Sequence, residues 1–172
     1  EGVQLCLGYR SSRLEAEQLR QALSPLVSTH LIQGDVSQEK DVLRMVESVC
    51  QKFGELSFLI NLASGFPRAP LDSLNVDSWE RAEPAARASY LLAVHASRKM
   101  RENSGPTRGH IILFSDWAAG GTPYLDYLPY LTSKAAISFM SRAFASELAP
   151  YGVLVNTIAP GPTMRPSEIS QE

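Results

Sequence analysis

Apolar residues along the chain fall into five short runs, separated by longer stretches in which apolar residues recur at helical spacing. The runs are continuous rather than alternating with polar residues, which is typical of parallel strands covered on both faces. We predict strands at residues 3–9, 30–32, 56–60, 110–114 and 152–158. We predict helices at residues 12–23, 38–53, 78–100 and 127–148. This alternation predicts one α/β domain over residues 1–172, built on a parallel sheet.

Capping residues and prolines indicate where these helices begin and end. Ser12 and Ser37 are suited to cap the first two helices, and Gly54 is suited to end the second. Either Asp77 or Ser78 opens the long third helix. Pro84 lies inside that helix, where a proline is expected to produce a kink.

Composition and charge narrow the functional classes. The chain carries 16 Lys and Arg against 18 Asp and Glu, a net charge of −2, which excludes a strongly basic surface for nucleic acid. No apolar run approaches the ~18 residues that cross a bilayer, so we predict no membrane partner. Cys6 and Cys50 lie within apolar patterns, which excludes a disulfide scaffold and predicts a reducing, cytoplasmic location. The three histidines are scattered, and we predict no metal site.

Tyr130 and Lys134 form the strongest chemical signal. Because they lie four residues apart on a predicted helix, they share one face of it. A free tyrosine has a pKa near ~10 and is a poor base at neutral pH. A neighbouring ammonium favours the phenolate and lowers that pKa, so the phenol could give or take a proton near neutral pH.

This pair and three strand-end motifs together resemble the short-chain dehydrogenase/reductase family. The motifs are Asp35-Val36, Asn61-Leu62-Ala63-Ser64 and Asn156-Thr157-Ile158-Ala159-Pro160-Gly161. The resemblance covers essentially the whole chain and implies a Rossmann-like, doubly wound parallel sheet. It implies that Tyr130 donates a proton to a substrate carbonyl or imine, and that Lys134 holds the nicotinamide ribose and lowers the pKa of Tyr130. It further implies that Asp35 and Val36 border the adenine, that Asn61 and Ala63 form a turn close to the cofactor, and that Pro160 and Gly161 face the nicotinamide.

The end of the first strand indicates which cofactor is bound. Family members that use NAD typically place an acid there, whereas this chain has Tyr9-Arg10-Ser11-Ser12. An arginine and two hydroxyls suit a 2′-phosphate, through charge-assisted hydrogen bonds. We therefore predict NADP(H), contacted by Arg10 and Ser11. The alternative is a solvated arginine at the start of a helix.

Within the family, the chain resembles the pteridine-reductase-like branch. The segment from Asn61 to Phe66 is similar to that branch's Asn-Asn-Ala-Ser-x-Phe, which implies that Ser64 and Phe66 line the substrate pocket. A flat ring could stack between Phe66 and the nicotinamide, although Phe66 could instead cover the sheet edge. Asp116 aligns where most of the family has serine and this branch has aspartate. It could relay a proton to a ring nitrogen or pair with Lys134, and Ser115 is the alternative for the usual serine role.

The chain departs from the family pattern in three places. No Gly-x-x-x-Gly-x-Gly turn precedes Val3, the chain stops at Glu172 soon after Pro160-Gly161, and the long helix has Ala85 or Ala86 in place of an asparagine. We therefore expect a partial domain that lacks the first and last strands of the family fold and is inactive alone.

These observations predict an NADPH-dependent reductase that transfers hydride to a C=O or C=N bond of a small-molecule substrate, such as a pteridine. Two alternatives remain open. One is a general carbonyl or 3-oxoacyl reductase, and the other is a truncated, non-catalytic scaffold. The helices at 78–100 and 127–148 resemble those of the family's subunit interface, so we predict a homo-oligomer.

Overall fold

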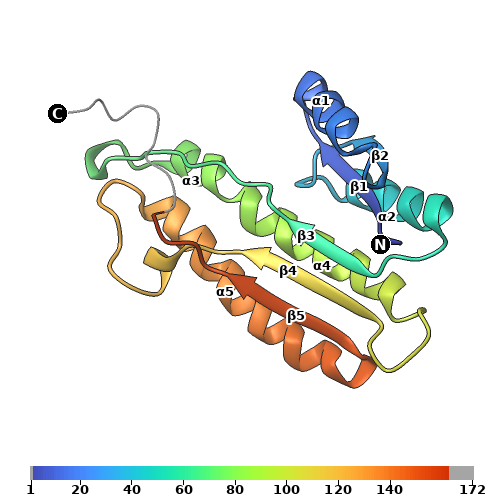
Figure 1. The fold of residues 1–172 in the computed structure, drawn as a ribbon. Helices are drawn as coiled ribbons and strands as arrows, with labels where there is room; N and C mark the ends of the chain where they lie inside the picture. The colour runs from blue at the N-terminus through green and yellow to red at the C-terminus, as the bar shows by residue number, and fades with distance from the viewer. Residues whose placement is uncertain (1, 163–172) are drawn as a thin grey trace.

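The computed structural model describes residues 2–162, in which strands and helices alternate along the chain (Figure 1). The strands are β1 (Gln4–Tyr9), β2 (Ser28–Gln33), β3 (Phe58–Asn61), β4 (Gly109–Phe114) and β5 (Val153–Ile158). The helices are α1 (Arg13–Leu23), α2 (Glu39–Phe53), α3 (Val76–Ala82), α4 (Pro84–Met100) and α5 (Leu128–Leu148), with short 3-10 turns η1 (Leu71–Ser73), η2 (Trp117–Ala119) and η3 (Ala149–Tyr151). Each predicted strand is present, with its ends within two residues of the predicted ones.

The strands are parallel to their neighbours but form two separate sheets. β1 pairs with β2, and β4 pairs with both β3 and β5. The α/β, Rossmann-like class predicted from the sequence is therefore confirmed. Within residues 2–162 no strand joins β1 to β3, so each of these strands has one edge without a strand partner.

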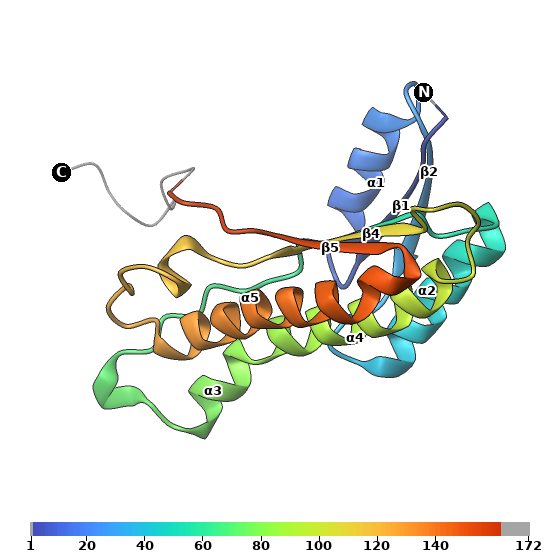
Figure 2. The same cartoon turned by 90° about the horizontal axis from the view of Figure 1, so that it is seen from below.

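The helices cover the sheets unequally. α2, α4 and α5 lie along one side, and α1 packs on the other side against β1 and β2 (Figure 2). The main core is formed by apolar side chains of β4, β5, α4 and α5: Ala93, Ala96, Met100, Ile111, Leu113, Ile137, Val153 and Val155. On the opposite face of the three-stranded sheet, Phe58, Ile60 and Ile158 are 60%, 55% and 46% exposed. The prediction that both faces are covered is therefore wrong for this sheet in the described part of the chain, because α4 and α5 both pack on the same face.

A contact between α2 and α4 joins the part of the molecule built on β1 and β2 to the part built on β3, β4 and β5. Val42 and Val46 of α2 pack against Leu92 of α4. Beside them, the buried His95 of α4 places Nε2 at 2.9 Å from Oε1 of Glu39 in α2. The β1–β2 half is therefore attached to the rest of the molecule by packing between side chains.

The third predicted helix is two helices. Pro84 occupies the first position of α4, where its missing N–H costs no helical hydrogen bond, so the chain is interrupted there instead of kinking within one helix. α3 begins after Asn75 rather than at Asp77 or Ser78. The Asn75 side chain accepts from the Ser78 N–H at 2.9 Å, and the Ser78 hydroxyl accepts from the Asn75 N–H at 3.0 Å.

The caps of the first two helices agree with the sequence in part. Ser12 stands at the N-terminal cap of α1, but its hydroxyl makes no capping hydrogen bond. Gln38, not Ser37, precedes α2, because Ser37 donates to Asp35 instead. Gly54 ends α2 as predicted, with φ at 87° and its N–H donating to the Cys50 carbonyl at 2.8 Å.

Candidate active site

Tyr130 and Asp116 meet at the carboxyl end of the three-stranded sheet. Tyr130 lies in the first turn of α5 and is 7% exposed. Its hydroxyl donates to Oδ2 of Asp116 at 2.8 Å. The other carboxylate oxygen of Asp116 accepts from the Ala118 N–H at 2.9 Å, at the start of η2. The carboxylate is therefore held with one oxygen on the backbone and the other on the phenol.

The electrostatics at Tyr130 are opposite to those expected from the sequence. Burial, and then the hydrogen bond to the Asp116 carboxylate, raise the pKa of Tyr130 above its ordinary value. Lys134 Nζ lies 5.7 Å from the centroid of the Tyr130 ring and donates to the Phe114 carbonyl at 3.0 Å. Burial also lowers the pKa of Lys134, and Asp116 partly opposes that shift. The predicted lowering of the Tyr130 pKa by Lys134 is therefore not found, because burial and the touching Asp116 carboxylate both disfavour the phenolate.

Ser115 is directed into the packing between β4 and α5. Its hydroxyl donates to the Lys134 carbonyl at 2.8 Å and lies 2.6 Å from the Ser138 hydroxyl. Of the two residues considered for the usual serine position, the structure brings Asp116 and not Ser115 to Tyr130.

Aromatic side chains surround the Tyr130 ring. Phe66 stacks on Tyr127 with 4.2 Å between ring centroids and meets Tyr130 edge-on at 4.7 Å. Tyr124 lies near both Phe66 and Tyr127, and its hydroxyl accepts from Trp117 Nε1 at 2.6 Å. Phe66 is half exposed, and Ser64 is also exposed, with its hydroxyl donating to the Gly65 carbonyl. Sequence reasoning missed Trp117, Tyr124 and Tyr127, although tyrosines at every third residue from 124 to 130 were a visible signal.

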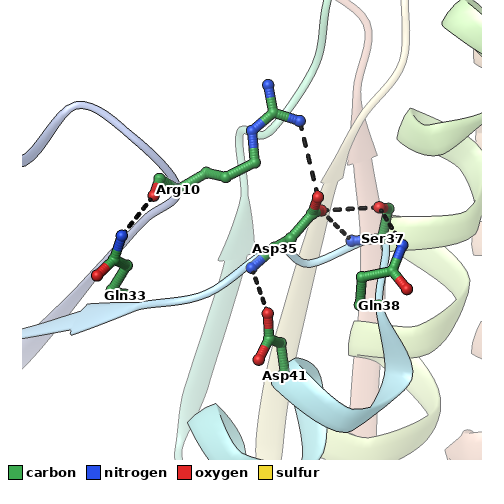
Figure 3. A network of polar contacts seen from close by, with 6 residues as sticks. All are labelled: Arg10, Gln33, Asp35, Ser37, Gln38 and Asp41. Atoms are coloured by element: carbon green, nitrogen blue, oxygen red, sulfur yellow. Dashed lines mark hydrogen bonds and ion pairs between the residues drawn. The ribbon is translucent and has the colours of Figure 1, made fainter.

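The residues predicted to contact the adenosine end of a cofactor gather at the ends of β1 and β2 (Figure 3). The Arg10 side chain is 72% exposed, and its Nη1 lies 3.8 Å from Oδ2 of Asp35. Gln33 Nε2 donates to the Arg10 carbonyl at 3.0 Å. Oδ1 of Asp35 accepts from the Ser37 hydroxyl at 2.7 Å and from the Ser37 N–H at 2.9 Å, and these bonds lower the pKa of Asp35.

Beside this group, a hollow of about 870 Å³ extends along β2 and α2 and is bordered by Arg10 and Asp35. An exposed guanidinium next to exposed Ser11 is a donor set that fits a phosphate group. Val36, which was predicted to border the adenine, does not line this hollow and instead packs on the cluster of α2 and α4 side chains.

The other predicted cofactor residues shape the strand ends. Buried Asn61 donates from Nδ2 to the Ser89 hydroxyl at 3.0 Å, and its Oδ1 accepts from the Ala63 N–H at 3.1 Å. These bonds hold the turn that exposes the backbone after β3. Pro160 accepts from the Trp117 N–H at 3.3 Å, and Gly161 is exposed beside it. Within residues 2–162, no hydrogen bond links the turn at residues 61–63 or the turn at residues 160–161 directly to Arg10 or Asp35.

Two other kinds of site are not found within residues 2–162. No three His, Cys, Asp or Glu side chains come together in a way that could hold a metal ion. No helix among the described ones is long and apolar enough to cross a membrane.

Comparison with known proteins identifies the family. A family model described as enoyl-(acyl carrier protein) reductase matches residues 1–171. The chain is 30% identical over 167 residues to the uncharacterized oxidoreductase YhdF of Bacillus subtilis, covering 96% of this chain and 56% of that protein. It is 26% identical over 164 residues to an L-rhamnose 1-dehydrogenase (NADP(+)) of Thermoplasma acidophilum, covering 94% of this chain and 63% of that protein. A crystal structure of a short chain dehydrogenase from Burkholderia cenocepacia in complex with NADP superposes with a TM-score of 0.85 at 27% identity, covering 93% of this chain and 64% of that one.

The chain therefore belongs to the family of that model, within the short-chain dehydrogenases/reductases. It spans 56% and 63% of the lengths of the two curated relatives.

Proposed function

We propose that the whole protein is an NADP(H)-dependent oxidoreductase that reduces a C=O or C=N bond of a small molecule. The observation that carries this proposal is the buried Tyr130 phenol, which lies at the carboxyl end of a parallel sheet and donates to Asp116 at 2.8 Å. The family membership of the chain adds support. Ligands bind at this end of the strands in open α/β sheets. A reducing, cytoplasmic location would be consistent with the two free cysteines.

Arg10 and Ser11 are the residues proposed to hold the 2′-phosphate that distinguishes NADPH from NADH. Arg10 is exposed, and Gln33 and Asp35 restrain its backbone and side chain. A related solved structure contains NADP, and one relative carries NADP(+) in its name, which supports this cofactor. Bound NADPH would supply the hydride that reduces the substrate carbon.

Tyr130 is proposed as the proton donor. The oxygen or nitrogen of the reduced bond takes the proton that leaves Tyr130 Oη. With its pKa above the ordinary value, the Tyr130 phenol is protonated at neutral pH and holds a proton to donate, although it is a weaker acid than a free tyrosine. Lys134, as a buried cation on the same helix, is proposed to bind the ribose next to the reacting ring.

The substrate is proposed to be a flat ring with N–H groups, of which a pteridine is an example. Phe66 offers a ring face for stacking, and Ser64 lies exposed on the same loop. The Asp116 carboxylate can accept a hydrogen bond from a ring N–H, which a serine hydroxyl would do more weakly.

A subunit interface is proposed on the outer faces of α4 and α5. Tyr90 and Phe139 are 49% and 64% exposed there, and Ala135, Ala136 and Ala143 are exposed small residues that permit close helix approach.

The test is NADPH oxidation by the whole protein, with a dihydropteridine and with simple ketones. Tyr130→Phe is expected to lower turnover by about 10²–10⁴-fold, the usual contribution of a positioned proton donor, while NADPH binding is retained. Tyr151→Phe is the matched control, because this half-exposed tyrosine lies in η3, beyond the end of α5 that is far from Tyr130. If the whole protein oxidises NADPH with none of these substrates, the proposal is wrong.

A further inference from the structure

Two loops that border Tyr130 are held together by hydrogen bonds. The first loop covers residues 62–70 after β3, and the second covers residues 120–127 before α5. Arg68 donates from Nε and Nη2 to Oδ2 of Asp126, at 3.2 Å and 2.7 Å. Ala69 N–H donates to the Asp126 carbonyl at 2.7 Å. We call this set of contacts, across 58 residues of sequence, the Arg68–Asp126 clasp.

The backbone around the clasp is restrained on both sides. Pro67 and Pro70 flank the Arg68-Ala69 pair, and each proline fixes its own φ and disfavours helical geometry in the residue before it. Ala69 is 4% exposed, so this segment is anchored in the protein. Asp126 has φ at 68°, in the left-handed region that Asp tolerates better than most residues.

The clasp lies next to the two rings that shape the site. Phe66 is two residues before Arg68, and Tyr127 directly follows Asp126. Their rings stack at 4.2 Å with 19° between planes, and Phe66 meets the Tyr130 ring at 4.7 Å and 89°. Each ring is at most two residues from the clasp, so the clasp is close enough to affect how the two loops present them.

We propose that Arg68 and Asp126 are positioning residues that hold Phe66 and Tyr127 together as an aromatic wall beside the Tyr130 phenol. The wall gives the site a preference for flat, ring-bearing substrates over small aliphatic ones. This preference rests on the proposed reductase function, whereas the positioning of the rings does not.

A purely stabilising role is a poor explanation for the clasp. The Arg68 side chain is 66% exposed and that of Asp126 is 30% exposed. Ion pairs this exposed contribute little to global stability. The clasp instead restrains two loops that lack regular structure at the edge of the site, so its effect is expected to be local.

A fluorine label tests the positioning without any need for activity. In the whole protein, 4-fluorophenylalanine at position 66 reports on the ring currents of Tyr127 and Tyr130. Arg68→Met and Asp126→Asn are each expected to move its ¹⁹F resonance toward the value of the unfolded protein. Arg20→Met is the matched control, because Arg20 forms an exposed pair with Glu17 on α1. A resonance that stays in place in both clasp variants would overturn the proposal.

Substrate preference is tested with two carbonyl compounds, menadione as the flat ring and butane-2,3-dione as the small aliphatic. Arg68→Met is expected to lower the kcat/KM ratio of menadione to butane-2,3-dione by about two- to fivefold, the scale of an exposed ion pair, through the KM of menadione. Asp126→Asn is expected to do the same, and the double variant no more than either single one, because both remove one interaction. Equal losses for both compounds would overturn the preference.

The two proposals can fail separately. If the unsubstituted protein reduces neither compound, the proposed reductase function is contradicted for these two substrates. Titration of the labelled protein with menadione then decides the preference, since weaker binding in Arg68→Met is the expected result. Equal binding by the unsubstituted protein and Arg68→Met would overturn it.

Discussion

At the scale of single residues, the charge nearest the Tyr130 phenol is negative. Asp116 accepts from the hydroxyl at 2.8 Å, whereas the Lys134 ammonium is bound to the Phe114 carbonyl. Helical spacing could place Tyr130 and Lys134 on one face of α5, because that relation is local. It could not show which charge would meet the phenol, because Asp116 reaches it from the end of another element.

Asp116→Asn is expected to lower the pKa of Tyr130 relative to the unsubstituted protein. The amide keeps the shape of the side chain but removes the charge that opposes phenolate formation. Ultraviolet titration of tyrosinate measures the shift, and subtraction of the Tyr130→Phe curve isolates this residue. An unchanged Tyr130 titration would show that the carboxylate does not control the phenol.

Asp35→Asn is expected to reduce stability at neutral pH and to have no effect in strong acid. Hydrogen bonds from Ser37 lower the pKa of Asp35 below its ordinary 3.8. A carboxyl whose folded pKa is depressed contributes stability above its ordinary pKa, and the contribution is lost as pH falls through the folded pKa. Denaturant unfolding at neutral pH and below the folded pKa measures this. A difference of the same size at both pH values would contradict the expectation.

At the scale of elements, the hydrophobic pattern placed the strands well but the helix ends less well. Strands follow from continuous apolar runs such as residues 110–114, whereas caps depend on backbone geometry that neighbouring elements set. Thus Asn75 caps α3 although Asp77 and Ser78 were equally plausible capping residue types. Of the aromatic wall, only Phe66 was predicted. Its stacking on Tyr127 could not be, because the two rings belong to loops that follow different strands.

Asn75→Ala is expected to lower the free energy of unfolding by about 1 kcal/mol, because it removes the side-chain acceptor at the start of α3. Ser12→Ala is the control at another helix start, since the Ser12 hydroxyl makes no capping bond and its loss should change little. Denaturant unfolding of both variants compares them. Equal destabilisation by the two substitutions would argue against the assigned caps.

At the scale of the whole molecule, the sequence predicted the α/β class and the order of elements but not the uneven covering of the sheet. Apolar runs indicated burial on both faces, yet Phe58 and Ile60 lie on an uncovered face within residues 2–162. A pattern of apolar residues shows what a surface favours as a neighbour. It cannot show whether the described part of the chain supplies that neighbour.

Hydrogen exchange of this chain is expected to divide the strands by their pairing. β4 is paired on both sides, so its amides should exchange most slowly. β1 and β3 each have one edge without a strand partner in the described part, so amides on those edges should exchange faster. Exchange measured by nuclear magnetic resonance resolves individual amides. Equal protection of β1, β3 and β4 would contradict the two-sheet arrangement.

The contact between α2 and α4 has a mechanical consequence. No strand–strand hydrogen bond within residues 2–162 crosses from the half that carries Arg10 and Asp35 to the half that carries Tyr130 and Asp116. The two halves meet instead through side chains such as Val46 and Leu92, which can slide by small amounts without breaking backbone bonds. Within residues 2–162, the distance between the two predicted ends of the cofactor site therefore depends on the packing of α2 against α4. A long ligand that contacts both halves would add a second connection between them and would help to fix their spacing.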